Sequence, residues 1–136
     1  MARKAKAYVL DTWAVIAYLE DEPSGGQVED LIATAHEEQI PIYMSVINVG
    51  EIWYTIAREV SEEDANASVK SLRDLRIKFE DADWTLTQEA ARFKSQNKMS
   101  YADAFAAALA KVKKADLITG DTEFRPLDGE IKISWV

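Results

Sequence analysis

Short apolar runs alternate with longer stretches of helical period along this chain. Several of the apolar runs are continuous rather than alternating, which is typical of strands buried on both faces. The pattern predicts strands over 7–11, 40–44, 77–80, 117–119 and 131–135, and helices over 14–20, 27–38, 46–59, 61–75, 85–96 and 101–114. Residues 122–127 are predicted as a short turn or helix, and Pro23 to Gly26 as a loop.

Hydroxyl residues mark the expected starts of four helices. Ser45, Ser61, Thr85 and Ser100 each precede a helical stretch and can accept a hydrogen bond from a free backbone N–H of its first turn. These positions serve as N-cap predictions.

Strands separated by helices imply βαβ units and a parallel sheet that is covered on both faces. The sequence shows no internal repeat, linker or low-complexity segment. We therefore expect a three-layer α/β domain over residues 1–136, as a single domain. In such folds, ligands bind beyond the carboxyl ends of the strands.

Composition narrows the chemistry that is available. The absence of cysteine excludes disulfides and thiolate chemistry and fits a reducing cytoplasm, where we expect the protein to reside. The single histidine, His36, lies in a polar helix tail and is expected at the surface, so a multi-histidine metal site is excluded. No apolar run approaches the roughly 18 residues that span a bilayer, and the basic residues 1–7 do not resemble a secretory signal.

The net charge of −8 argues against a protein that binds nucleic acid through a broad basic surface. It does not exclude a nuclease, because carboxylates in a metal site count toward the total and bound cations reverse the local sign. The charge also suits a basic protein partner. Basic side chains that are candidates for phosphate contact, or for ordinary solvated faces, are Arg3, Lys4, Lys6, Lys94, Lys98, Lys111, Lys113 and Lys114.

Four acidic residues stand at the edges of predicted core elements. Asp11 and Asp121 follow apolar strands, whereas Glu51 and Asp103 lie on apolar helices. An ionised carboxylate that leaves water carries a large cost unless a cation or hydrogen bonds compensate it. The pattern predicts one acidic pocket that binds a divalent metal, and oxygen ligands favour Mg²⁺, Mn²⁺ or Ca²⁺ over zinc.

Each acid also has a structural interpretation that the sequence leaves open. Asp11 can cap the following helix, and Asp103 can form a capping box with Ser100. Glu51 can sit half-solvated at the boundary of an amphipathic helix, and Asp121 can be a turn residue. The joint pattern at strand ends and helix starts is what favours a shared site.

Four segments together resemble the PIN domain, and specifically the VapC-type ribonuclease toxins of type II toxin–antitoxin systems. The segments that carry the resemblance are Val9-Leu10-Asp11-Thr12, Met44-Ser45-Val46-Ile47-Asn48-Val49-Gly50-Glu51-Ile52, Ser100-Tyr101-Ala102-Asp103-Ala104-Phe105 and Thr119-Gly120-Asp121-Thr122-Glu123-Phe124. They occur in the family's order on matching predicted elements, and the similarity runs nearly from end to end.

The resemblance implies a Mg²⁺- or Mn²⁺-dependent RNA endonuclease with a mostly parallel five-stranded sheet. It also implies a homodimer that is inhibited by a cognate antitoxin. The catalytic and metal-binding residues would be Asp11, Glu51, Asp103 and Asp121. Thr12 and Thr119 would be supporting groups, while the sequence does not place Glu123.

We expect the metal to activate water for attack on a phosphodiester. Four neighbouring acids should raise at least one pKa in the metal-free protein. A noncatalytic acidic α/β interaction module and a nontoxic PIN nuclease of RNA processing remain alternatives. A haloacid-dehalogenase phosphatase is disfavoured, because Trp13 stands where its second aspartate is needed.

Overall fold

The computed structural model of the protein describes residues 4–136, so the candidate phosphate contact Arg3 lies outside the described residues. In chain order the elements are β1 (Tyr8–Leu10), α1 (Thr12–Leu19), α2 (Gly25–Glu38), β2 (Ile42–Ser45), α3 (Val46–Glu59), α4 (Glu62–Asp74), β3 (Ile77–Glu80), α5 (Trp84–Gln96), α6 (Tyr101–Lys113), β4 (Asp116–Thr119), the 3-10 helix η1 (Thr122–Leu127) and β5 (Lys132–Trp135). The predicted alternation of strands and helices is confirmed.

The strands form one sheet in the order β3-β2-β1-β4-β5, and every neighbouring pair is parallel. The expected mostly parallel, five-stranded sheet is thus wholly parallel in residues 4–136. The central strands β1 and β4 are apolar on both faces: Val9 and Leu117 point to one core, and Leu10 and Ile118 to the other. This two-sided burial explains why their sequences are continuous apolar runs.

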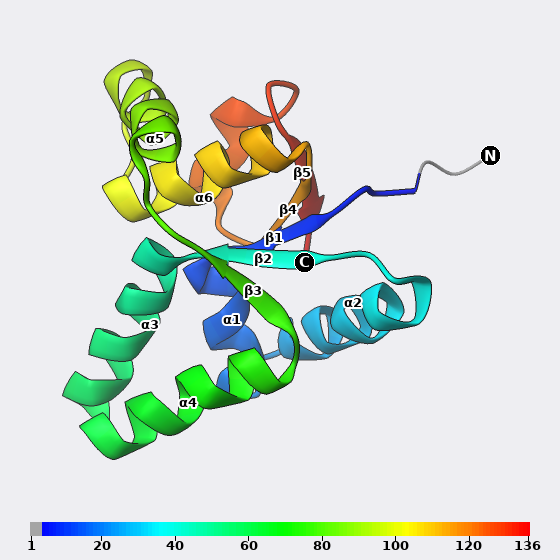
Figure 1. Ribbon diagram of the computed structural model, residues 1–136, viewed down its shortest axis with the longest axis vertical. Coiled ribbons are helices and arrows are strands. Elements are labelled where there is room, and N and C mark those ends of the chain that lie inside the picture. The colour runs from blue at the N-terminus through cyan, green and yellow to red at the C-terminus, as the bar shows by residue number, and fades with distance from the viewer. Residues whose placement is uncertain (1–3) are drawn as a thin grey trace.

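Helices cover both faces of the sheet, as Figure 1 shows: α1 to α4 lie on one side, and α5 and α6 on the other. The chain builds β1, β2 and β3 in one direction and then crosses to β4 on the far side of β1. Right-handed crossovers in opposite directions place their helices on opposite faces. The strand order therefore reverses between β1 and β4, where such folds bind ligands.

The register fixes which residues meet at that reversal. Leu10 of β1 is aligned with Ile118 of β4, so the next residues along each strand, Asp11 and Thr119, emerge side by side. On the other side of β1, β2 leads through Ser45 directly into α3. The helices α1, α3 and η1 thus all begin at the carboxyl ends of the central strands.

Helix α6 lies against α5 and the sheet, and five of its seven buried residues are alanine. Ala104, Ala106, Ala107, Ala108 and Ala110 are all buried, with at most 1 % of their surface exposed. Small side chains let this helix approach the sheet closely. The close packing brings the first turn of α6 to the same edge as Asp11.

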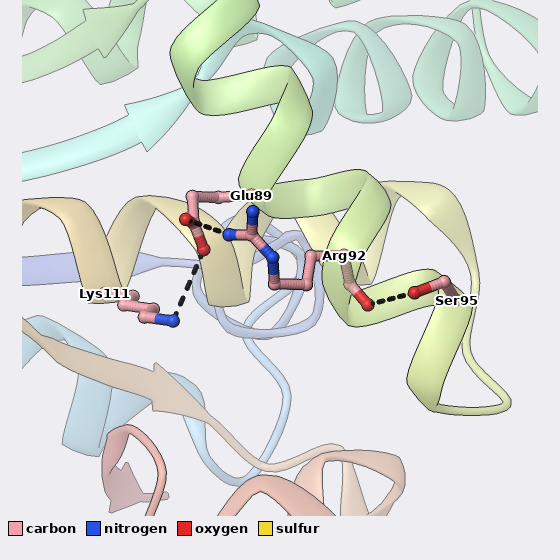
Figure 2. Close-up of polar contacts among 4 residues, drawn as sticks. All are labelled: Glu89, Arg92, Ser95 and Lys111. Carbon is pink, nitrogen blue, oxygen red and sulfur yellow. Dashed lines mark hydrogen bonds and ion pairs between the residues drawn. The ribbon is translucent and has the colours of Figure 1, made fainter.

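An ion-pair network joins α5 to α6, as Figure 2 shows. Glu89 of α5 accepts from Arg92 one turn later and lies 3.4 Å from the Nζ atom of Lys111 on α6. The hydrogen bond from Arg92, and then the contact with Lys111, hold the pKa of Glu89 below its usual range. Ser95 donates to the backbone carbonyl of Arg92 at 2.7 Å.

Two local predictions are wrong. The N-cap of α5 is Asp83, which accepts from the N–H of Leu86 at 2.9 Å, and not Thr85. The loop predicted to end at Gly26 ends earlier, because α2 already begins at Gly25. A Cβ on Gly25 would lie 2.5 Å from the carbonyl oxygen of Ala17, so this glycine serves close packing of α2 on α1.

Other boundaries differ by one or two residues from those predicted, as is usual for helix and strand ends. His36 is exposed as expected, but its Nε2 atom also lies 2.7 Å from the carbonyl oxygen of Leu75, which links α2 to the end of α4. In the part of the chain described, no helix combines the length and apolar character that crossing a membrane requires.

Candidate metal centre

Buried polar side chains gather at the carboxyl end of the central strands. Among residues 4–136, four polar or charged residues are buried, each with 1 % or less of its surface exposed: Asp11, Ser45, Asn48 and Thr119. Buried polar groups are costly unless they are hydrogen-bonded, and an ionised one is the most costly of all. Their concentration in one place makes this edge of the sheet the candidate functional site.

Asp11 is held by hydrogen bonds to both of its carboxylate oxygens. Oδ1 accepts from the N–H of Ala14 at 2.8 Å, which caps α1, and Oδ2 accepts from the hydroxyl of Thr119 at 2.5 Å. The same Thr119 oxygen accepts from the N–H of Asp121 at 3.0 Å. One hydroxyl therefore fixes the position of Asp11 relative to the start of the Asp121 turn.

Burial raises the pKa of Asp11 to about 7, against the lowering effect of its two hydrogen bonds. The negative charges of Asp103 and Asp121 contribute further to the rise. Burial is also the largest cause that raises the pKa of Asp103 to about 6, followed by the charge of Asp121. The expected rise in pKa is confirmed, but desolvation contributes more to it than repulsion between the acids does.

Three carboxylates converge beside Asp11. Each of three residues offers one carboxylate oxygen, and these oxygens lie within 4.8 Å of one another. The residues are Asp103 in α6, Asp121 just before η1, and Glu123 in η1. Asp103 lies in the first turn of α6, capped by the Ser100 hydroxyl, and Asp121 caps η1 by accepting from the N–H of Glu123 at 2.9 Å. The Ser100 hydroxyl caps α6 as predicted, and Asp121, which was predicted as a turn residue, caps η1; both roles are compatible with the convergence of the carboxylates.

Glu51 approaches this cluster from α3. Its charge contributes to the raised pKa of Asp103, which places it within electrostatic reach of the cluster. Its Oε2 atom accepts from the hydroxyl of Tyr54 one turn later at 3.4 Å. Glu51 is half-buried and stands at the rim, whereas Asp11 forms the floor of the site.

Trp13 lies across the turn between β4 and η1. A Cβ added to Gly120 would come within 2.2 Å of the Trp13 ring, so the indole lies directly against the backbone of this glycine. Gly120 stands between Thr119 and Asp121, both part of the site. The indole ring therefore packs against the turn that positions Asp121.

The residues present fit a hard divalent cation. The carboxylates supply oxygen donors, which Mg²⁺ and Mn²⁺ prefer. Within residues 4–136 no lysine, arginine or histidine forms an ion pair with Asp11, Glu51, Asp103 or Asp121. A cation at this point would balance charge that the described part of the chain leaves uncompensated.

The fold brings all four sequence-predicted acids to one edge of the sheet. It also brings two groups that the sequence could not assign. Glu123 joins Asp103 and Asp121, and Asn48 is buried between α1, α3 and α6. The only sequence signal for Glu123 was its place two residues after Asp121, and Asn48 gave none.

An all-parallel three-layer α/β fold with a carboxylate-lined site at its topological switch point defines the class of this protein. The chain belongs to the PIN domain family, whose model matches residues 8–130. A sequence search against curated proteins gave no match.

Solved structures share the fold at low sequence identity. VapBC2 from Rickettsia felis, bound to a promoter DNA fragment, aligns with 17% identity over 96% of this chain and 98% of that chain, with a TM-score of 0.74. DNA-bound VapBC from Salmonella typhimurium aligns with 17% identity over 94% and 96%, with a TM-score of 0.77. VapC20 from Mycobacterium tuberculosis, a toxin that cleaves the sarcin–ricin loop, aligns with 18% identity over 90% and 95%, with a TM-score of 0.71.

Proposed function

We propose that this protein is a Mg²⁺- or Mn²⁺-dependent RNA endonuclease and the toxin of a toxin–antitoxin pair. The observation that carries the proposal is a buried aspartate without an ion-pair partner in the described chain, beside three converging carboxylates. Membership of the PIN family supports hydrolysis of nucleic acid. The likeness in fold to a toxin that cleaves the sarcin–ricin loop favours RNA as substrate.

In this proposal Asp103 and Asp121 bind the cation. Glu51 and Glu123 at the rim, and Asp11 at the floor of the site, supply the further carboxylates around it. A bound divalent cation supplies Lewis acidity, which lowers the pKa of water and neutralises charge on the scissile phosphate. Thr119 holds Asp11 in place through its 2.5 Å hydrogen bond. His36 takes no part, because it binds the end of α4 and not the site.

The proposed partners follow from charge and from the related assemblies. One structure with this fold is a toxin–antitoxin complex, and another is of a member of the VapBC family of toxin–antitoxin systems. A net charge of −8 would attract an antitoxin that carries a basic segment. We further propose a single domain over residues 1–136 that works as a homodimer in the cytoplasm.

The test is cleavage of a panel of RNAs by the wild type and by Asp11→Asn, with Mn²⁺ or with EDTA. We expect cleavage by the wild type with Mn²⁺ only, and none by Asp11→Asn. Asp74→Asn is the matched control, because Asp74 is an exposed acid that pairs with Lys70 far from the site. Equal cleavage by all three proteins would identify a contaminating nuclease and refute the assignment.

Two alternatives predict different results. A noncatalytic acidic module would neither bind Mn²⁺ nor cut RNA. A nontoxic nuclease of RNA processing would cut RNA without arresting growth on expression. Growth arrest that the product of an adjacent gene relieves would support the toxin assignment.

A further inference from the structure

A buried asparagine links the helices that carry the proposed site. Asn48 lies in the first turn of α3 and has no exposed surface. Its Nδ2 group donates to the hydroxyl of Thr12 at 3.2 Å and to the backbone carbonyl of Ala102 at 3.1 Å. Thr12 begins α1 directly after Asp11, and Ala102 precedes Asp103 on α6. One side-chain amide thus connects the starts of three helices; Asp11 directly precedes α1, and Glu51 and Asp103 lie on α3 and α6.

The orientation of this amide follows from its partners. A backbone carbonyl only accepts hydrogen bonds, so the Asn48 atom that faces Ala102 must be the nitrogen. The Oδ1 atom then faces elsewhere, and among the described residues this buried oxygen has no hydrogen-bond partner. An unpartnered buried acceptor destabilises a protein. The nitrogen of the amide, through its two hydrogen bonds, is therefore the group that links the three helices.

The same orientation constrains the hydroxyl of Thr12. Because Asn48 offers a donor, the Thr12 oxygen must accept, and the hydroxyl hydrogen must point away from Asn48. Thr12 is half-buried, unlike Asn48, so its hydroxyl hydrogen is free to point toward solvent. This geometry suits donation to an oxygen of a bound phosphodiester.

We infer that Asn48 is a positioning residue, which fixes α1 relative to α6 and turns the Thr12 hydroxyl toward the substrate. The inference rests on the proposed nuclease function and deepens it. Asn48 touches neither metal nor substrate; it acts through Thr12 and through the backbone that carries Asp11 and Asp103. Residues that orient metal ligands in this way typically contribute about 10- to 100-fold to metal affinity or activity.

The first experiment compares Asn48→Leu and Asn48→Ala with the control Ile56→Ala. Ile56 is buried on the same helix two turns later, away from the site. For each protein we would measure stability in urea, Mn²⁺ affinity by calorimetry without RNA, and kcat and KM for RNA cleavage at saturating Mn²⁺. Asn48→Leu removes both donors and the unpartnered oxygen, and Asn48→Ala guards against failure of the leucine to fit.

We expect the Asn48 variants to bind Mn²⁺ about tenfold more weakly and to lose about 10- to 100-fold in kcat. We expect Ile56→Ala to lose stability while its Mn²⁺ affinity and kcat stay at wild-type values. A folded Asn48 variant with wild-type Mn²⁺ affinity and kcat would overturn the inference and leave the nuclease assignment intact. A wild type that neither binds Mn²⁺ nor cuts RNA would overturn both.

A double-mutant cycle tests the path through Thr12. Thr12→Val removes the hydroxyl, so adding Asn48→Ala to it should reduce kcat by less than Asn48→Ala does in the wild type. Effects on kcat that multiply independently would refute the role assigned to the Thr12 hydroxyl. The Mn²⁺ affinity of the double variant should fall as in Asn48→Ala alone, because the backbone connection to Ala102 does not involve Thr12.

Discussion

Replacing Asp11 by asparagine should stabilise the metal-free protein while abolishing the proposed RNA cleavage. Asp11 has 1 % of its surface exposed, and burial raises its pKa to about 7 from an ordinary value of 3.8. A neutral amide of nearly the same shape can still accept from the N–H of Ala14. The substitution also removes the buried charge, which lowers the free energy of unfolding of the wild type.

The magnitude follows from the pKa. Each pKa unit corresponds to about 1.4 kcal/mol, so the ionised carboxylate costs the fold about 4 kcal/mol well above pH 7. The folded pKa is raised, so the contribution of the protonated group to stability is complete below pH 3.8 and is lost as pH rises to about 7. Losing the acceptor of the Thr119 hydroxyl offsets the gain by about 1 kcal/mol at every pH.

The assay is urea unfolding followed by tryptophan fluorescence at pH 5 and pH 8 in EDTA. The stability of Asp11→Asn relative to the wild type should increase by about 3 kcal/mol from pH 5 to pH 8. Adding Mn²⁺ at a hundred times the dissociation constant of the wild type should return about 2.7 kcal/mol to the wild type and less to the variant, which keeps Asp103 and Asp121 but lacks the charge of Asp11. Asp74→Asn should show no such dependence. A relative stability that is equal at both pH values would refute the argument that Asp11 is desolvated.

Three further substitutions test other parts of the structure. Gly120→Ala places a Cβ against the Trp13 ring, so it should cost about 1–3 kcal/mol, shift the tryptophan fluorescence and reduce RNA cleavage. Thr119→Val removes the donor to Asp11, so a titration should find the pKa of Asp11 raised further, and urea unfolding should show a loss of about 1–3 kcal/mol that is larger at pH 8, where Asp11 is ionised, than at pH 5. Glu89→Gln weakens only the surface ion-pair network, so it should cost at most about 1 kcal/mol and leave the cleavage rate unchanged; a lost rate would contradict a purely structural network.

The sequence predicted most of the fold, because hydrophobic period and strand burial are local signals. The continuous apolar runs at β1 and β4 reflect burial on two faces, which the sheet confirms. The errors arose where two local signals competed. Asp83 and Thr85 are both good N-cap residues, and in the structure it is the Asp83 side chain that accepts from the first turn of α5. Gly25 resembled loop punctuation, but it is helical because α2 packs tightly on α1.

The site was only partly accessible from the sequence. Asp11 and Asp121 could be assigned to a shared edge, because parallel strands end together. The convergence of Asp103 with them depends on how closely α6 approaches the sheet, which local pattern does not determine. Asn48 could not be found at all, because its role depends on contacts with residues 36 and 54 positions away in the sequence.

The capping and metal-binding interpretations of Asp11 are parts of one arrangement. Oδ1 caps α1 and Oδ2 accepts from Thr119, and each of these hydrogen bonds favours the ionised form. Burial opposes ionisation more strongly, so near pH 7 the carboxylate is balanced between its two states. A divalent cation at the adjacent carboxylates would shift that balance toward the charged form. The hydrogen bonds thus hold Asp11 in position. Burial opposes its ionisation, and a bound cation would favour it.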